Sequence, residues 1–152
     1  MKNQTINTLL IFIIVSVTTG CQKFSTIKIE QKDNQLAFNF SDINETKNSQ
    51  YILYDIAVSR NNCTAENCVY WEIVRDQAYF DSLEYSLHSN TILYGSKPDA
   101  MKVTTPPRPL SSGEYSVAAS VGIVENSRFK KSLKIFQKFK LTISNNKNLH
   151  IE

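Results

Sequence analysis

Glycine, histidine and cysteine are scarce in this chain, and each scarcity argues against a class of site. The 152 residues contain four glycines, two histidines and three cysteines. No glycine cluster forms a phosphate-binding loop, so the sequence holds no nucleotide-binding motif. Cys63 and Cys68 lack the Cys-x-x-Cys spacing of a redox site, and zinc would need two further ligands where the chain offers only His88 and His150, far apart in sequence. We therefore expect neither a cofactor nor a metal.

A membrane-spanning apolar run and a strong net charge are also missing. The apolar run from Leu9 to Val17 is about half of the ~20 residues that cross a bilayer as a helix. A formal net charge of +3 is too weak to indicate a nucleic acid partner. What the composition does supply is 41% hydrophobic and 11% aromatic residues, which is enough for a packed core.

The first 21 residues have the layout of an export signal. A single cation precedes the apolar run, and small residues follow it and end at a cysteine. The segment Thr18-Thr19-Gly20-Cys21 resembles the lipobox of bacterial lipoproteins. That resemblance implies that the Cys21 thiol carries a diacylglyceryl group and that the signal peptide, residues 1–20, is removed. Gln22 stands where an Asp would resemble an inner-membrane retention signal, so we expect a palmitate-type anchor in the outer membrane, with the domain facing the periplasm.

The alternatives are an ordinary signal peptide, cut near Gly20 and leaving Cys21 as an unmodified thiol, and a segment that stays uncut at the membrane interface. Cutting before Cys21 leaves 132 residues, the size of a single domain. We expect that domain to span residues 21–144, and residues 145–152 to form a loose C-terminal tail.

Alternation of apolar and polar residues predicts strands along most of the remaining chain. The clearest is residues 114–124, where the apolar side chains share one face. In residues 51–59 the same counting places Ile52 and Tyr54 on the buried face, and in residues 68–75 it places Trp71 there. The predicted strands are residues 24–30, 35–41, 51–59, 68–75, 91–95, 101–104, 114–124 and 131–144.

Two segments also fit a helix. Residues 78–88 have apolar positions at helical spacing and are expected to form a short crossover helix. Residues 129–140 fit either a strand or a basic amphipathic helix whose cationic face touches anionic lipid. The strand is favoured because period-two counting explains more of the segment.

A tyrosine motif indicates the kind of β fold. The stretch Leu110-Ser111-Ser112-Gly113-Glu114-Tyr115-Ser116-Val117 resembles the tyrosine corner of immunoglobulin-like and fibronectin-type sandwiches. In those domains a tyrosine opens a strand, and its hydroxyl bonds to backbone a few residues upstream. Together with seven or eight strands and turn signals between them, the motif leads us to expect an all-β, antiparallel immunoglobulin-like β-sandwich.

Four residues of the domain stand out as candidates for a bond or a site. Cys63 and Cys68 are an even pair in an exported domain, and we expect them to form a disulfide that clamps the connection between two strands. Tyr51 and Tyr70 are expected to face outward as candidate binding residues, because alternation buries their neighbours. Outward tyrosines on a sandwich are typical of contact surfaces.

The sequence contains no convincing catalytic constellation, so we expect a protein that is not an enzyme. The favoured hypothesis is a lipid-anchored module that docks an envelope protein. A glycan or ligand binder that uses the outward tyrosines is the alternative. A third hypothesis is a metal-dependent envelope hydrolase centred on Glu84 and His88, which would share one face of the crossover helix.

Overall fold

The computed structural model describes residues 26–43, 49–63, 68–80, 82–83, 90–145 and 148–152. In these residues the chain is built of strands in two antiparallel sheets, with no α-helix and two short 3-10 turns, η1 (Ser41–Ile43) and η2 (Gln77–Tyr79). The all-β expectation is therefore confirmed. The strands are β1 (Lys28–Lys32), β2 (Gln35–Asn39), β3 (Gln50–Arg60), β4 (Val69–Arg75), β5 (Thr91–Leu93), β6 (Met101–Thr105), β7 (Gly113–Glu125), β8 (Arg128–Ile143) and β9 (Leu149–Ile151).

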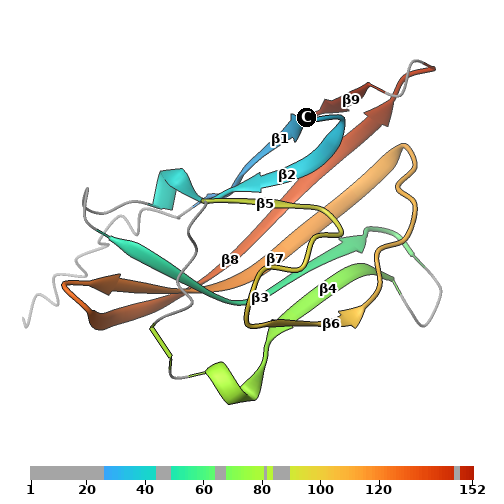
Figure 1. Ribbon diagram of the computed structural model, residues 1–152. Helices are drawn as coiled ribbons and strands as arrows, with labels where there is room; N and C mark the ends of the chain where they lie inside the picture. The colour runs from blue at the N-terminus through green and yellow to red at the C-terminus, as the bar shows by residue number, and fades with distance from the viewer. Residues whose placement is uncertain (1–25, 44–48, 64–67, 81, 84–89, 146–147) are drawn as a thin grey trace, which may run out of the picture.

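The two sheets lie face to face in a sandwich-like arrangement. A small sheet has the order β1-β2-β5, and a large sheet has the order β6-β4-β3-β7-β8-β9. Figure 1 shows the small sheet lying across the large one. Two long strands at the centre of the large sheet, β3 and β7, pair along almost their whole length, so they form the platform on which the rest of the fold is assembled.

The core lies between the sheets because apolar side chains alternate toward it along every long strand. From the small sheet, Phe38 stacks on Trp71 of β4 with ring centroids 6.2 Å apart. Tyr94 meets the same indole edge to face at 5.4 Å. Trp71 is fully buried, as the sequence predicts for this residue, and its indole Nε1 has no hydrogen-bond partner. The fully buried large side chains include Ile27, Leu36, Phe38, Phe40, Tyr51, Leu53, Ile56, Trp71, Ile73, Tyr115 and Ile123.

The tyrosine motif has the expected geometry. Tyr115 opens β7 and is fully buried, and its hydroxyl donates to the carbonyl of Ser111 at 2.9 Å. The same hydroxyl oxygen accepts from the Ser111 backbone N–H at 3.2 Å. One buried phenol thereby satisfies both backbone groups of a residue in the turn before its own strand, which holds that turn against the end of the sheet.

Two β-bulges, one in β3 and one in β4, interrupt the pairing of β3 with its neighbours. The register with β7 shifts between Leu53 and Asp55, and the register with β4 shifts between Val58 and Ser59. A bulge places two residues opposite one and reverses the alternation beyond it. The prediction that Ile52 and Tyr54 share the core face with the second half of this strand is therefore wrong: Tyr51 and Leu53 face the core in the first half, and Ile52 is buried on the opposite side.

The strand pairing settles two further expectations, and a third lies partly outside the described residues. Residues 129–140 are strand, within β8, and not an amphipathic helix. The tail prediction for residues 145–152 is wrong at its end, because Leu149–Ile151 form β9 on the edge of β8, where backbone pairing and a bond from Leu149 N–H to the Gln31 side chain hold them. Of the predicted crossover helix 78–88, the structure describes only the η2 turn and its surroundings, and residues 84–89 lie outside the described part.

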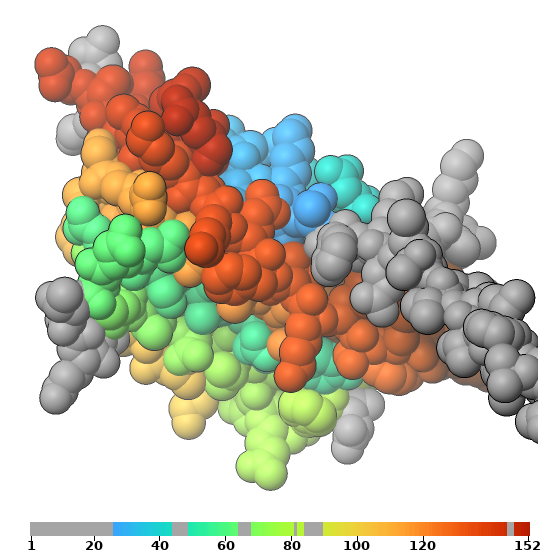
Figure 2. All heavy atoms as spheres, turned by 180° about the vertical axis from the view of Figure 1, so that it is seen from behind, coloured from blue at the N-terminus to red at the C-terminus, as the bar shows by residue number. Residues whose placement is uncertain are grey.

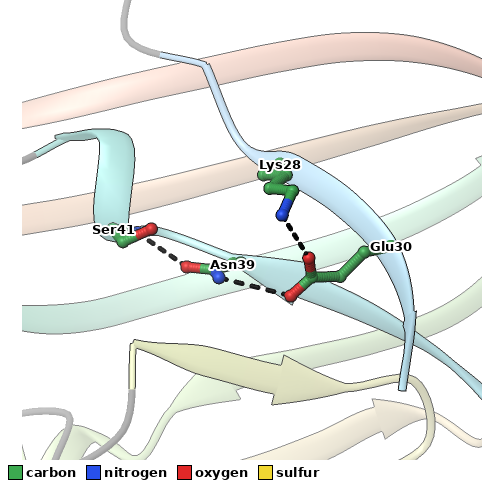
Figure 3. A network of polar contacts seen from close by, with 4 residues as sticks. All are labelled: Lys28, Glu30, Asn39 and Ser41. Atoms are coloured by element: carbon green, nitrogen blue, oxygen red, sulfur yellow. Dashed lines mark hydrogen bonds and ion pairs between the residues drawn. The ribbon is translucent and has the colours of Figure 1, made fainter.

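The first hairpin is locked by a polar network on side chains of β1 and β2 (Figure 3). Lys28 and Glu30 form an ion pair at 2.7 Å, and the Asn39 amide donates to Glu30 at 3.3 Å. The Asn39 side-chain oxygen accepts from the Ser41 backbone N–H at 2.9 Å. The hydrogen bond from Lys28 is the main cause that lowers the pKa of Glu30 below its usual value. The network fixes the place where the chain joins the sandwich.

Candidate binding groove

One hollow in the described surface lies on the outer face of the six-stranded sheet. It measures about 480 Å³ and opens over the middle strands of that sheet. Figure 2 shows the molecule from this side, with β8 in orange to red crossing it. We call this hollow the outer groove. Its lining residues are Tyr54, Asp55, Val74, Arg75, Phe80, Ser120, Phe129 and Ser132.

Aromatic rings form the walls of the outer groove. Phe80 and Phe129 are each 51% exposed, which is high for side chains of that size. The rings of Tyr54 and Phe80 lie 5.0 Å apart in a tilted contact. A smaller hollow of about 230 Å³ continues between the same rings and adds Ile52 and Leu83. Exposed aromatic side chains that cluster at one hollow are typical of contact sites, whereas single ones are ordinary.

A glycine on β7 permits the approach of two of these rings. A Cβ atom at Gly122 would lie 2.9 Å from Cε2 of Tyr54 and 3.0 Å from Cε2 of Phe129. Both distances are shorter than carbon atoms tolerate without movement. Gly122 is therefore the floor on which the Tyr54 and Phe129 rings rest, and the rings in turn bury it.

A buried arginine holds the segment that carries Phe80. Arg75 is 5% exposed and lies at the end of β4. Its Nε donates to the carbonyl of Tyr79 at 2.8 Å and its Nη2 to the carbonyl of Ser82 at 2.7 Å. Burial lowers the pKa of the Arg75 guanidinium, yet an arginine stays charged at physiological pH. The guanidinium thereby holds the backbone of Tyr79 and of Ser82, on either side of Phe80.

The polar part of the outer groove comes from one row across the sheet. Asp55 on β3 pairs in register with Val74 on one side and with Ser120 on the other, and Ser120 pairs with Lys134. The row therefore presents a carboxylate, a hydroxyl and an ammonium group beside the aromatic walls. This arrangement suits non-covalent binding of a ligand that offers apolar surface together with polar or charged groups.

The two tyrosines predicted to face outward do not form this site. Tyr51 is 1% exposed and belongs to the core, so the prediction for it is wrong, and the bulge between Leu53 and Asp55 is the reason. Tyr70 is half-buried and packs edge to face on Tyr115, with ring centroids 5.5 Å apart. The bulge at the β3–β4 pairing skips Tyr70 and removes it from the regular alternation.

Tyr70 instead joins a cluster of arginines and tyrosines at one end of the sandwich. Arg60 donates to the Tyr70 hydroxyl at 3.3 Å and lies 5.9 Å from the centre of the Tyr115 ring. Arg108 lies 5.8 Å from the centre of the Tyr70 ring. The Tyr94 hydroxyl bonds to the carbonyls of Tyr70 and Arg108, and burial raises the pKa of Tyr94 to about 12. These contacts close the end of the core beside the segment that contains Pro106, Pro107 and Pro109.

Cys63 and Cys68 form a disulfide with their Cα atoms 5.7 Å apart, as predicted, and it clamps the connection between β3 and β4. Cys21, Glu84 and His88 lie outside the described residues. Within the described part of the chain, no three His, Cys, Asp or Glu side chains gather where they would hold a metal ion. In that same part, no helix has the length and hydropathy to cross a bilayer.

Sequence reasoning missed Phe80, Phe129 and Asp55 as site residues. Phe80 lies in the segment 78–88, for which the spacing predicts a helix, and Phe129 begins the segment 129–140, for which a helix is the alternative to a strand. Alternation alone would place Phe129 on the face of Ile135, and the register shift between β7 and β8 turns it outward. Comparison of the chain with family models, with curated proteins and with solved structures returns no match.

Proposed function

We propose that this protein is a non-enzymatic, lipid-anchored module of the bacterial envelope that docks a partner protein in the outer groove. The observation that carries the proposal is the groove itself: exposed aromatic walls, a glycine floor and one carboxylate on the face of a rigid sheet. Exposed rings of this kind gain hydrophobic free energy only when a partner covers them.

The domain that presents the groove is of the immunoglobulin-like kind in this proposal. The order β1-β2-β5 opposite β4-β3-β7-β8 supports it, because consecutive strands change sheets between β2 and β3 and again between β4 and β5. The Tyr115 corner supports it independently. Such sandwiches serve many functions, so the function is argued from the groove alone.

The anchor rests on the leader sequence. The lipobox-like Thr18-Thr19-Gly20-Cys21 supports acylation of Cys21, and Gln22 supports placement in the outer membrane, with the domain facing the periplasm. Two or more acyl chains hold a soluble domain on a bilayer stably. Intact-mass measurement of the membrane-extracted protein is expected to show acyl groups on Cys21, and a bare thiol there would contradict the anchor.

The groove indicates what its partner offers. An apolar side chain would pack against the exposed rings of Phe80 and Phe129, and a lysine or arginine beside it would meet the carboxylate of Asp55. The groove is open to solvent, which suits a surface loop or an extended segment of a protein. The rigid backbone below it means that little ordering is needed on this side of the complex.

Site-specific cross-linking in the envelope tests the docking site. A photoreactive residue in place of Phe80 is expected to capture a partner, and one in place of Val103, which is 37% exposed on β6, is the matched position outside the groove. Asp55→Lys should remove the captured band, whereas Asp99→Lys, the same change outside the groove, should retain it. Equal capture in both charge variants would contradict the proposal.

A glycan ligand is the second candidate, because aromatic walls beside Asp55, Ser120 and Ser132 also suit stacked sugar rings and their hydroxyl groups. Thermal unfolding with cell-wall fragments separates the two candidates. A rise in melting temperature that Phe80→Ser abolishes would favour the glycan, and an unchanged melting temperature is expected for a protein-docking site.

A further inference from the structure

Positive charge is concentrated on one strand of this protein. Within β8, six residues are cationic and none is acidic: Arg128, Lys130, Lys131, Lys134, Lys138 and Lys140. From Gln22 to Glu125 the chain has nine Lys or Arg against thirteen Asp or Glu. The small net charge of the whole chain therefore hides a basic strand on an otherwise acidic domain.

This strand is also an edge over most of its length. β7 pairs with β8 from Arg128 to Leu141, whereas β9 covers only the opposite side of Leu141–Ile143. In the described residues, no strand pairs with the outer side of residues 128–138. We call residues 128–138 the basic edge. Lysines on an edge strand keep other sheets from adding to it, which accounts for part of the charge.

Edge protection does not account for the phenylalanines. Phe136 is 65% exposed, the highest value among the large apolar side chains described as exposed, and it lies between Lys134 and Lys138 on the outward side of β8. Its neighbour in register on β7 is Ala118, which is too small to cover a ring. An exposed ring flanked by two ammonium groups is the composition of a surface that meets lipid headgroups.

The path of the chain places the basic edge near the anchor. The backbone N–H of Ile27 donates to Oε1 of Gln137 on β8 at 3.1 Å, so the chain joins the sandwich beside this strand. Cys21 is six residues earlier. Six residues span at most about 20 Å even when fully extended. An acylated Cys21 would therefore hold Gln137, and the edge around it, within about that distance of the bilayer.

We propose that the basic edge lies on the anionic lipid surface to which the protein is tethered, with Phe136 at the headgroup level. This inference rests on the lipid anchor of the proposed function and adds an orientation to it. Tyr54 and Asp55 lie on β3, which β7 separates from β8 in the large sheet, so the lipid contact is made at one edge of the face that carries the outer groove. Cations near an anionic surface each contribute to binding and are screened by salt.

The test uses the unacylated chain from Gln22 onward. The strands and buried core residues of the described part of the chain all lie between Ile27 and Ile151, so the chain from Gln22 onward retains them. We expect it to sediment with vesicles of 30% phosphatidylglycerol in phosphatidylcholine, and not with pure phosphatidylcholine. The pair Lys134→Glu and Lys138→Glu should weaken that binding at least tenfold, Phe136→Ser about threefold, and half-molar salt should abolish it.

The matched control makes the same charge change elsewhere. Lys97 and Lys102 are exposed, and Lys102 lies on β6, at the opposite edge of the large sheet. The pair Lys97→Glu and Lys102→Glu should bind the vesicles almost as the unchanged chain does. An equal loss of vesicle binding in both double variants would contradict the proposal for the basic edge, since it would show an effect of net charge alone. If the glutamate pair in β8 does not fold, Lys134→Gln with Lys138→Gln provides the same comparison.

Two further outcomes would overturn the inference. Sedimentation equilibrium that shows a dimer lost in the β8 variants would mean that the edge pairs with a second copy of the chain. Tight binding to duplex DNA at physiological salt would mean that the charge serves nucleic acid. Acyl groups on Cys21 of the native protein, found together with no vesicle binding, would leave the anchor intact and remove only the orientation.

Discussion

β7 and β8 are neighbours in one sheet and pair residue by residue, yet they are opposite in chemistry. β7 is almost entirely buried, with small or apolar side chains on both faces: Val117, Ala119 and Val121 toward the core, Ala118 and Ser120 outward. β8 buries only Ile135, Phe139 and Leu141, and exposes a cation or a ring at most other positions. Position in the sheet explains the contrast, because a central strand has neighbours on both sides and an edge strand has only one.

The contrast shows where function is accessible in this fold. β7 exposes few side chains, and it affects the adjacent strands through packing. Gly122, for example, allows the rings of Tyr54 and Phe129 to lie close to its backbone. β8 contributes Phe129 and Ser132 to the outer groove, and both residues lie within the basic edge, residues 128–138. Stability is therefore concentrated in the central strand, and recognition is expected at the edge.

The largest expected effect comes from placing a charge on each strand in turn. Val117→Asp would bury a carboxylate in the core and cost more than about 4 kcal/mol, enough to unfold the domain. Phe136→Asp, at the position that pairs with Ala118, should change the free energy of unfolding by about 1 kcal/mol or less. Urea denaturation followed by circular dichroism measures both. Unfolding by Phe136→Asp would show that β8 is covered in solution.

The next largest effect on stability is expected from removing the Tyr115 hydroxyl at the start of β7. Tyr115→Phe keeps the ring and removes both bonds to Ser111, and it should lower the free energy of unfolding by about 1–3 kcal/mol. Tyr70→Phe is the control, because it loses only the 3.3 Å bond from Arg60 and should cost less than about 1 kcal/mol. Equal losses in the two variants would mean that the corner has no special role in holding the turn.

Gly122 on the outward face of β7 leaves the space in which the rings of Tyr54 and Phe129 pack. Gly122→Ala should displace the Tyr54 and Phe129 rings while lowering stability by about 1 kcal/mol or less, since the atoms that must move are the far ends of side chains. Aromatic NMR signals of the outer groove should shift and partner capture through Phe80 should fall. Ala118→Val, also on the outward face of β7, is the control and should leave both unchanged.

The smallest effect on stability is expected from the deprotonation of Tyr94, near the start of β7, at alkaline pH. The pKa of Tyr94 is raised by burial from 10.0 to about 12. Because the folded value is above the unfolded one, the stability that the neutral phenol contributes is complete below about pH 10 and is lost as the pH rises through 12. Urea midpoints between pH 9 and 12 should fall less steeply in Tyr94→Phe than in the unchanged chain. Parallel declines would place the alkaline loss elsewhere.

Local patterns predicted most of the secondary structure. All eight predicted strands exist, with ends that differ by a few residues, because alternation over five or more residues reflects one buried face. The disulfide and the tyrosine corner also formed as expected, since both join residues close in the chain. β9 was missed because three residues in a polar segment become a strand only through the edge of β8.

The site was harder to predict than the strands. Tyr51 was placed outside because counting by two assumes an unbroken register, and the bulge beside Leu53 is a property of the pairing with β7. The outer groove joins residues from β3, β4, β7 and β8 with Phe80 from the segment after β4. No short stretch of sequence contains enough of it to be recognised.

The amino-acid sequence by itself determined the β class, the position of nearly every strand, the Cys63–Cys68 bridge and the contacts that Tyr115 makes, because each depends on periodicity or on neighbours within a few residues. Only the tertiary structure decided the strand order, the faces that the bulges reverse, and the separation between a buried β7 and an exposed β8. Those features depend on which strands lie beside each other, and adjacency in a sheet is set by packing across the whole domain.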